Sequence, residues 1–218
     1  MFTLTPVQLL GAAVLLAGCA TQPAPEWQAN AHSALQRATR AYLAGADRVA
    51  TAEWRLAQTE LARTAQPEQV FRGVVLNCAV HQSALQLHHC TPAHAMQQHA
   101  SAADAAYVRY LSAAHQLSDV PLLPAAQQAV AAALLAGDVP TLASITDSLS
   151  RLVAASVVLQ QRGPNPALLQ TAVDTASAQG WRKPLLAWLQ LQMQYAQQQG
   201  DTALVHQVER RIATLQSP

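Results

Sequence analysis

Hydrophobic positions recur at helical spacing along much of the chain, and no valine- or threonine-rich stretch alternates as a strand does. The C-terminal segment shows the pattern most clearly, because its apolar residues fall on one face. These residues are Leu204, Val205, Val208, Ile212 and Leu215. Their spacing predicts an amphipathic helix that packs through one side.

The segment that precedes this helix is apolar on two sides. The two stripes are Leu185, Leu189 and Met193 and, at seven-residue spacing, Trp181, Trp188 and Tyr195. A helix that is buried on two sides is an interior layer of a stack. The pattern therefore predicts stacked antiparallel helix hairpins, arranged either as an irregular solenoid or as a plain helical bundle.

Three breaks in the helical pattern share a glycine that is followed closely by an aspartate. They are Gly45-Ala46-Asp47, Gly137-Asp138 and Gly200-Asp201. Glycine suits the left-handed position that ends a helix, and aspartate suits the N-cap of the next helix. Each break is therefore predicted to be the tight turn of an antiparallel helix pair, with Asp119 and Asn165 as further turn or cap residues.

Composition also favours an all-α fold, because hydrophobic residues make up 51% of the chain and aromatic residues only 5%. The apolar content is therefore mostly Ala, Leu and Val. Ala and Leu, with the abundant Gln, Glu and Arg, favour helices. The formal net charge is only +1 and no basic patch stands out, so we expect no nucleic-acid partner.

The N-terminus has the order of a bacterial export signal. An apolar run from Val7 to Ala17 is too short to span a bilayer, which needs about 20 apolar residues, but it has the length of a signal-peptide core. The run ends in Leu16-Ala17-Gly18-Cys19, which resembles the lipobox of bacterial lipoproteins at every position. One departure from such signals is that residues 1–6 contain no Lys or Arg.

The lipobox resemblance implies a division of the chain into three parts. Residues 1–18 would be a signal peptide, residues 19–26 a lipidated cysteine with a short tether, and residues 27–218 a helical periplasmic domain. Two or more acyl chains, such as palmitate, on Cys19 would anchor the protein stably to a membrane. Because Ala20 rather than Asp follows the cysteine, the family's sorting pattern implies the periplasmic face of the outer membrane.

A second resemblance lies in the predicted C-terminal hairpin. The motif Trp188-x2-Leu191-Gln192-x2-Tyr195 resembles the first helix of a tetratricopeptide repeat, whose pattern is W-x2-L-G-x2-Y. Gln192 stands where the repeat has a glycine that permits close helix approach, and the resemblance covers about one repeat. It implies a body of helical hairpins without a regular array.

Cysteine and histidine are concentrated in one internal segment. If lipid occupies Cys19, then Cys78 and Cys90 are the remaining pair, and the periplasm is an oxidising compartment. The sequence therefore predicts a disulfide between them. This bond would tie the end of a Gln69–Ala84 helix to the turn before Pro92.

A metal site is the alternative interpretation of this segment. Thiolate and imidazole groups are ligands of zinc and copper, and residues three apart share one face of a helix. The candidate ligands are Cys78, His81, His89, Cys90 and His94. A disulfide would remove both thiolates, so the two interpretations largely exclude one another, and we expect no metal or other cofactor if the disulfide forms.

Motifs of common hydrolases and nucleotide-binding enzymes are absent from the sequence, so we predict no catalytic residue. Glu53, beside Trp54, is the best candidate for the acid of a cell-wall hydrolase, whereas Glu60 and Arg63 are expected to pair on a solvated helix face. The leading hypothesis is a non-enzymatic interaction or accessory module with a protein partner in the cell envelope. A metal-binding lipoprotein and a cell-wall hydrolase are the alternatives.

Overall fold

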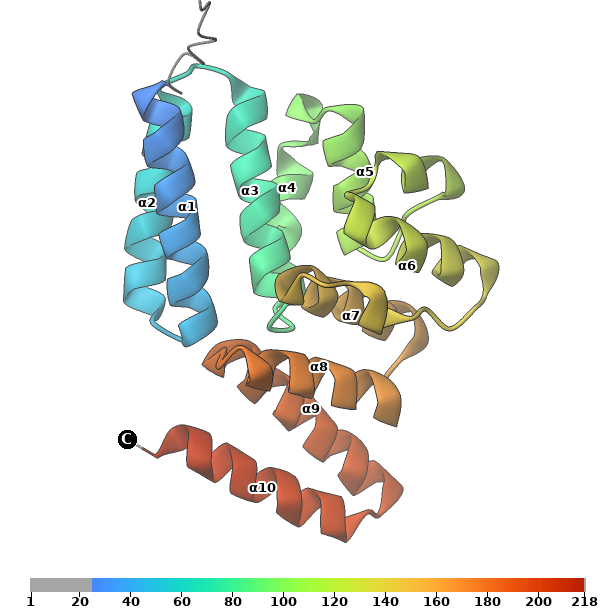
Figure 1. Ribbon diagram of the computed structural model, residues 1–218. Helices are drawn as coiled ribbons and strands as arrows, with labels where there is room; N and C mark the ends of the chain where they lie inside the picture. The colour runs from blue at the N-terminus through green and yellow to red at the C-terminus, as the bar shows by residue number, and fades with distance from the viewer. Residues whose placement is uncertain (1–24, 218) are drawn as a thin grey trace, which may run out of the picture.

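A computed structural model of the protein describes residues 25–217. These residues fold into helices with no strand among them, so the all-α prediction is confirmed (Figure 1). Within the same residues, no helix is both long enough and apolar enough to cross a bilayer. The predicted signal peptide, the lipidation site at Cys19 and the tether up to residue 24 lie outside the described part of the chain.

Ten α-helices make up most of the described residues. They are α1 (Glu26–Ala44), α2 (Asp47–Ala62), α3 (Pro67–Gln82), α4 (Thr91–Ala95), α5 (Ala102–Leu111), α6 (Ala125–Ala136), α7 (Ser148–Arg162), α8 (Pro166–Ala178), α9 (Arg182–Gln199) and α10 (Thr202–Gln216). Short 3-10 helices in the connections are η1 (Leu87–Cys90), η2 (Gln97–His99), η3 (Leu117–Leu122) and η4 (Leu142–Ser144).

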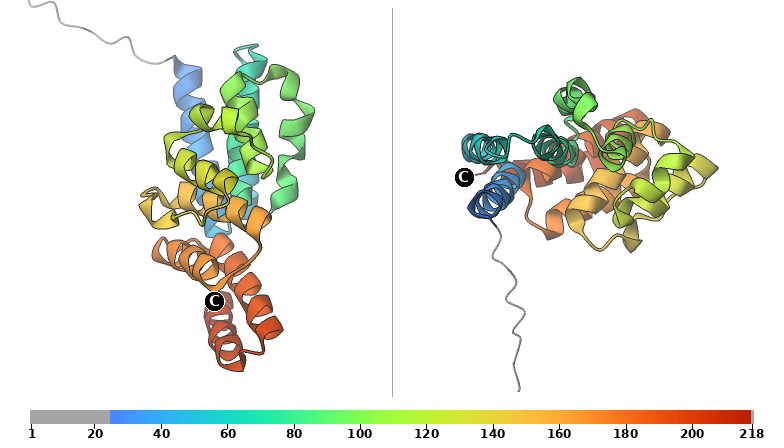
Figure 2. Two further views of the ribbon diagram at one scale, coloured as in Figure 1. Left: turned by 90° about the vertical axis from the view of Figure 1, so that its right-hand side faces the viewer. Right: turned by 90° about the horizontal axis from the view of Figure 1, so that it is seen from above.

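The helices are stacked from one end of the molecule to the other. The antiparallel pair α1–α2 packs against α3, and α4 and α5 pack against α3 as well (Figure 1). Next come α7 and α8, which run across the ends of these helices, and the hairpin α9–α10 closes the stack (Figures 1 and 2). As a result, α1 begins at the end of the molecule that is opposite to α10 (Figure 1).

Helix α7 is the centre of the hydrophobic core. All seven residues from Leu152 to Val158 are buried, including the polar Ser156, whose hydroxyl donates to the carbonyl oxygen of Val153 at 2.7 Å. A helix that is buried on all sides must have neighbours on all sides. Helices α3, α5, α6 and α8 supply them.

The sequence prediction of an interior layer is confirmed for α9. This helix packs against α8, α10 and α1, and its Trp188 is completely buried. The indole Nε1–H of Trp188 donates to the backbone oxygen of Ser83 at 3.0 Å. The bond connects the C-terminal hairpin to the end of α3, across 105 residues of sequence.

Helices α2 and α3 approach each other closely at Gly73. A Cβ atom at this position would lie 2.6 Å from Cδ1 of Leu61, which is too short for an ordinary contact, and 3.6 Å from the ring of Trp54. The absence of a side chain at Gly73 therefore lets the two helices pack against each other.

The glycine predictions at the three breaks are confirmed. Gly45, Gly137 and Gly200 end α1, α6 and α9 in the left-handed conformation, with φ of 84°, 87° and 70°. A residue with a Cβ atom would be strained at such angles. The glycines therefore mark the helix ends that the sequence indicated.

Of the three aspartates that were predicted to cap the next helix, one does so and two do not. Asp201 caps α10 by accepting the N–H of Leu204 at 2.9 Å, as predicted. Asp47 is the first residue of α2 and makes no capping bond, because its carboxylate pairs with Lys183. Asp138 caps nothing, because Pro140 disfavours helix in the residue before it and α7 begins only after Asp147.

The two further cap predictions hold. Asn165 caps α8 by accepting the N–H of Leu168 at 3.0 Å. Asp119 lies in η3, where its carboxylate accepts the N–H of Gln116 at 2.9 Å.

Candidate functional sites

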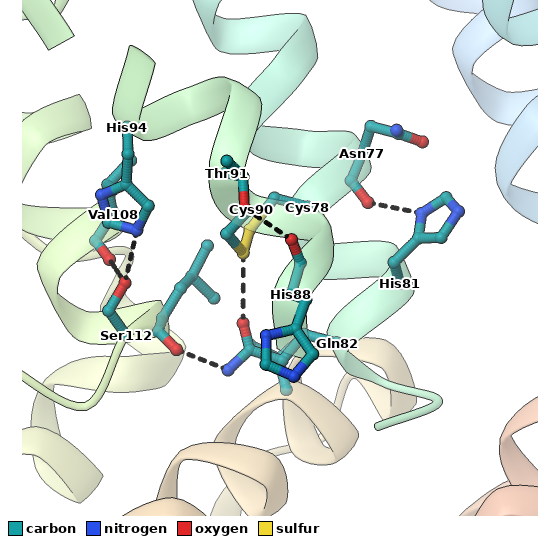
Figure 3. Close-up of a disulfide and its surroundings, with 12 residues drawn as sticks. Asn77, Cys78, His81, Gln82, His88, Cys90, Thr91, His94, Val108 and Ser112 are labelled. Atoms are coloured by element: carbon teal, nitrogen blue, oxygen red, sulfur yellow. Dashed lines mark hydrogen bonds between the residues drawn. A yellow bond between two sulfur atoms is a disulfide. The ribbon is translucent and has the colours of Figure 1, made fainter. Parts of the chain in front are cut away.

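Cys78 and Cys90 form a disulfide in the interior of the protein, as the sequence predicted (Figure 3). Their Cα atoms are 4.9 Å apart, which lies within the usual range for disulfides. Both residues are buried, with 0% and 5% of their surface exposed. The bond joins the last turns of α3 to η1, directly before α4, which contains Pro92.

Gln82 connects the disulfide to α5. Its side chain is completely buried, and its Nε2–H donates to the backbone oxygen of Leu111 at 2.6 Å. The Oε1 atom of Gln82 lies 3.8 Å from Sγ of Cys90 (Figure 3). The disulfide is thus packed inside a structural network and is sealed from solvent.

The histidines of the metal hypothesis are not gathered around the cysteines. His81 has its Nδ1 atom 2.8 Å from the carbonyl oxygen of Asn77, and His94 has its Nε2 atom 3.1 Å from Oγ of Ser112. The two imidazoles lie on opposite sides of the disulfide (Figure 3). The side chain of His89 lies outside what the structure describes.

The metal alternative therefore loses the two thiolates on which it depended, because each sulfur is bonded to the other. Among the described side chains, no three histidine, cysteine or carboxylate groups are placed to hold a metal ion.

A half-open pocket of about 340 Å³ lies between α1, α2, α3 and the start of α9. Leu35, Trp54 and Leu76 contribute to its apolar wall. Its polar end contains Tyr42 and Lys183.

The polar groups of this pocket are paired with one another. Lys183 Nζ pairs with Asp47 Oδ1 at 2.5 Å and lies 4.3 Å from the centre of the Tyr42 ring, which also contacts the ring of His81 at 4.0 Å between centroids. Burial, together with the negative charge of Asp47, raises the pKa of Tyr42. The phenol therefore stays neutral, and the Lys183 and Asp47 charges offset each other.

Glu53, the candidate acid of a hydrolase, is held by Arg37 of the neighbouring helix at 2.9 Å. The hydrogen bond from Arg37 lowers the pKa of Glu53. A general acid needs the opposite shift, because it must be protonated near neutral pH. The arrangement is that of a structural ion pair between α1 and α2.

The predicted pair of Glu60 and Arg63 is present, with 2.9 Å between Oε2 and Nη1. The expectation that Glu60 lies on a solvated face is wrong, because only 9% of the residue is exposed.

A second open cavity, of about 610 Å³, lies between α8, α9 and α10; we call it the C-terminal groove. Pro166, Leu169 and Leu204 contribute to its apolar surface. Gln192 and Asp201 contribute polar groups, and Asp201 is the only charged residue among the described residues that line it.

Gln192 is the unusual residue of the C-terminal groove. Only 4% of it is exposed, and its Oε1 atom is buried without a hydrogen-bond donor in the described structure. Its Nε2–H donates to Oε1 of Gln170 at 3.4 Å. A buried acceptor without a donor loses the free energy of its hydration without compensation, about 1–3 kcal/mol.

The orientation of the Gln192 amide follows from its neighbours. Gln170 donates through Nε2 to the carboxylate of Asp174 at 2.8 Å, so its own Oε1 must face Gln192. An oxygen on Gln170 requires a donor on Gln192, which places Gln192 Nε2 toward Gln170. The Oε1 atom of Gln192 is therefore the group without a partner.

The sequence singled out Gln192 only as a departure from the tetratricopeptide pattern. Gln192 lies four residues from Trp188 and four from Ala196, on the same buried face of α9. A polar residue at this spacing was the feature of the sequence that could have indicated an unusual position. That signal did not identify α8 as the third wall of the groove.

No model of a known protein family, no curated protein and no solved structure matches this chain. The function of the protein is therefore inferred from its own residues and geometry.

Proposed function

We propose that this protein is a non-enzymatic interaction or accessory module of the cell envelope. In this proposal, acyl groups on Cys19 hold it at the periplasmic face of the outer membrane, and the helical body binds a protein partner. The observation that carries the proposal is the C-terminal groove, where the buried Oε1 atom of Gln192 lacks a donor. A hollow with a largely apolar lining is the kind of surface at which protein partners dock.

The position of the groove supports this role. Helix α10 packs chiefly against α9, so the last hairpin leaves much of its surface free. The hairpin lies opposite to the start of α1, which is the end nearest to the proposed anchor (Figure 2). An N-terminal tether would therefore present the groove away from the membrane.

Site-specific photo-crosslinking in cells tests the proposal. The crosslinking amino acid p-benzoylphenylalanine would replace Gln199, an exposed residue of the groove. In a control strain it would replace Val139, which is 90% exposed and lies outside the groove. We expect a discrete protein adduct from position 199 that is absent from position 139.

Two results would contradict the proposal. Recovery of the protein without an adduct from either position would argue against a stable partner. Identical adducts from both positions would indicate unspecific contact rather than docking. Repeating the crosslinking after growth at several expression levels separates a saturable partner from random collision.

A further inference from the structure

We infer that a groove between α1 and α3 binds a single-chain amphiphile with an anionic head, such as a fatty acid, with its chain against Trp54 and its head at Arg40. This inference goes beyond the proposed function, because it concerns a different surface and a different class of ligand. It is carried by two connected cavities, by the pairing of the polar groups at the inner end and by one unpaired cation at the rim.

Two cavities together form this groove. The half-open pocket of about 340 Å³ shares Leu35, Thr39 and Leu76 with a more open hollow of about 460 Å³. The combined lining follows α1 from Tyr42 back to His32, which is about 15 Å at the rise of an α-helix. We call this continuous hollow the α1–α3 groove, and its shape suits an elongated ligand.

The walls of the α1–α3 groove present apolar surface that a ligand can reach. Leu76 is 38% exposed, and Leu35 and Trp54 are half-buried. These side chains come from three different helices, so they surround the hollow. Covering them with a hydrocarbon chain removes apolar surface from water on both partners.

The inner end of the groove requires no hydrogen bond from a ligand. Lys183 pairs there with Asp47, and the hydroxyl of Tyr42 donates to the backbone oxygen of His81 at 3.5 Å. A ligand with polar groups along its length, such as an extended peptide, would find these partners already engaged. A plain hydrocarbon chain loses nothing in the same place.

The volume of the inner pocket limits the ligand to one chain. A group the size of a water molecule fills roughly 30 Å³, so a cavity of about 340 Å³ holds on the order of ten such groups. Methylene groups are of similar size. The pocket therefore accommodates one chain of about ten carbons but not the paired chains of a phospholipid.

The charge of the rim selects the head group. Asp47 is the only carboxylate among the described residues that line the groove, and Lys183 neutralises it. Arg40 lines the outer part, is exposed, and makes no ion pair within the described part of the chain. One positive charge is therefore left over, and it lies where the ligand leaves the hydrocarbon-lined part.

Helix ends do not alter this balance. The amino ends of α2 and α9 and the carboxyl ends of α1 and α3 all meet at the inner end of the groove. Their partial charges are opposite in sign and offset one another. The guanidinium of Arg40 thus decides between an anionic and a cationic head.

Calorimetric titration of the full chain tests the inference, with Cys19→Ser introduced so that no detergent competes as an amphiphile. The probes are decanoate, 1-decanol and decyltrimethylammonium, each below the concentration at which it forms micelles. We expect decanoate to bind with a dissociation constant about fivefold lower than that of decyltrimethylammonium, since an exposed ion pair adds little. Equal affinities, or no saturable binding of decanoate, would overturn the inference.

Arg40→Gln tests the head group. We expect it to reduce the preference for decanoate over decyltrimethylammonium to less than about twofold, because it removes the unpaired cation. Arg210→Gln is the matched control, since Arg210 is exposed on α10 and lies outside the groove. The control removes the same charge and should keep the preference, and equal effects of both variants would overturn the assignment of Arg40.

Ala50→Leu tests the chain site, because Ala50 lines the inner pocket and a larger side chain there would fill it. We expect about a tenfold loss of affinity for decanoate. Ala52→Leu, at an exposed position of the same helix outside the groove, should bind as the parent does. Unchanged affinity in an Ala50→Leu variant with the parent's circular-dichroism spectrum would overturn the inference. Should this variant fail to fold, Leu76→Gln at an exposed position should cost about fivefold in affinity and decides instead.

Fluorescence quenching locates the bound chain. Bromine on the last carbon of decanoate quenches a tryptophan that it contacts, so we expect saturable quenching that is lost in Trp54→Phe. Trp27→Phe should keep the quenching, because Trp27 does not line the groove. Full quenching in Trp54→Phe would place the chain elsewhere and overturn the inference.

Other occupants of the groove give different results. Tighter binding of dihexanoylphosphatidylglycerol than of decanoate would overturn a single-chain ligand. A protein adduct from p-benzoylphenylalanine at position 76, without decanoate binding, would make the groove a protein-docking surface and overturn the inference. Crosslinking at position 199 reports on the C-terminal groove alone, so the proposed function stands or falls separately.

Discussion

Asp119 is a buried carboxylate whose charge is balanced within the protein. It pairs with Arg109 of α5 and accepts the N–H of Gln116, and only 3% of it is exposed. The hydrogen bond from Arg109 is the main reason that the pKa of Asp119 falls from 3.8 to about 2. A carboxylate with a lowered pKa contributes stability above pH 4, and this contribution is lost as the pH falls toward 2.

The variant Asp119→Asn keeps an acceptor for Gln116 but removes the charge. We expect it to lower the free energy of unfolding at pH 7 by about 1 kcal/mol, since Arg109 is 40% exposed and solvent screens the pair. The difference from the parent should shrink as the pH falls from about 4 to 2, where Asp119 becomes protonated. Urea unfolding across this range measures it. The exposed Asp138→Asn should show no such trend, and a constant difference for Asp119→Asn would contradict the assignment.

The disulfide makes a second prediction at the residue scale. Removing it with Cys78→Ser and Cys90→Ser together should cost about 3 kcal/mol, because the bond closes a loop with a separation of 12 residues. In the exported parent chain, neither thiol should react with a thiol reagent until a reductant is added. Metal analysis of the same sample is the control. Two reactive thiols with about one equivalent of zinc or copper would contradict the disulfide.

Residues that act on their neighbours in the sequence could be predicted, whereas pairs between distant segments of the chain could not. Gly200, Asp201 and Asn165 act on neighbours within a few residues, so their types alone indicated helix ends. The pair of Asp47 and Lys183 spans 136 residues. Nothing in the neighbourhood of either residue indicates the other, and the prediction of Asp47 as a cap was wrong for this reason.

At the scale of helices, Trp188 determines how α9 is fixed to the rest of the protein. Replacing it with Phe keeps an aromatic ring but leaves the backbone oxygen of Ser83 without its donor. We expect Trp188→Phe to lower the free energy of unfolding by about 1–3 kcal/mol. Chemical denaturation followed by circular dichroism measures this change.

Trp181→Phe serves as the control for this prediction, because Trp181 is only half-buried and lies at the start of the same helix. We expect it to cost clearly less than Trp188→Phe. Equal costs for both variants would mean that ring size, and not the bond to Ser83, sets the stability of α9.

The sequence identified α9 and α10 better than it identified α7. Two stripes on α9 and one on α10 predicted an interior and a surface helix, and the buried Trp188 and Val208 agree with this. The run from Leu152 to Val158 is apolar on all sides, so it has little periodicity to detect. Its place at the centre of the core follows from its neighbours in space.

At the scale of the whole molecule, the hairpin stack has two ends with different surroundings. Trp188 and Gln192 lie four residues apart on α9, and both are buried. The indole of Trp188 donates to the backbone at the end of α3, whereas Gln192 is among the residues that line the C-terminal groove, and its Oε1 atom has no donor within the described part of the chain. The last hairpin is therefore packed against the rest of the protein on one side and borders the open C-terminal groove on the other.

The proposed anchor would fix the orientation of this molecule in the envelope. Changing Cys19→Ser should abolish incorporation of labelled palmitate and release the protein from the membrane fraction, because the acyl groups would be its attachment. Cys78→Ser serves as the control for loss of a cysteine, and it should keep the label. Ala20→Asp should keep the label as well, but move the protein to the inner membrane in an enterobacterial host. If Cys19→Ser keeps both the label and the membrane location, the lipoprotein proposal is wrong. The proposed orientation of the C-terminal groove, facing away from the membrane, would then lose its basis.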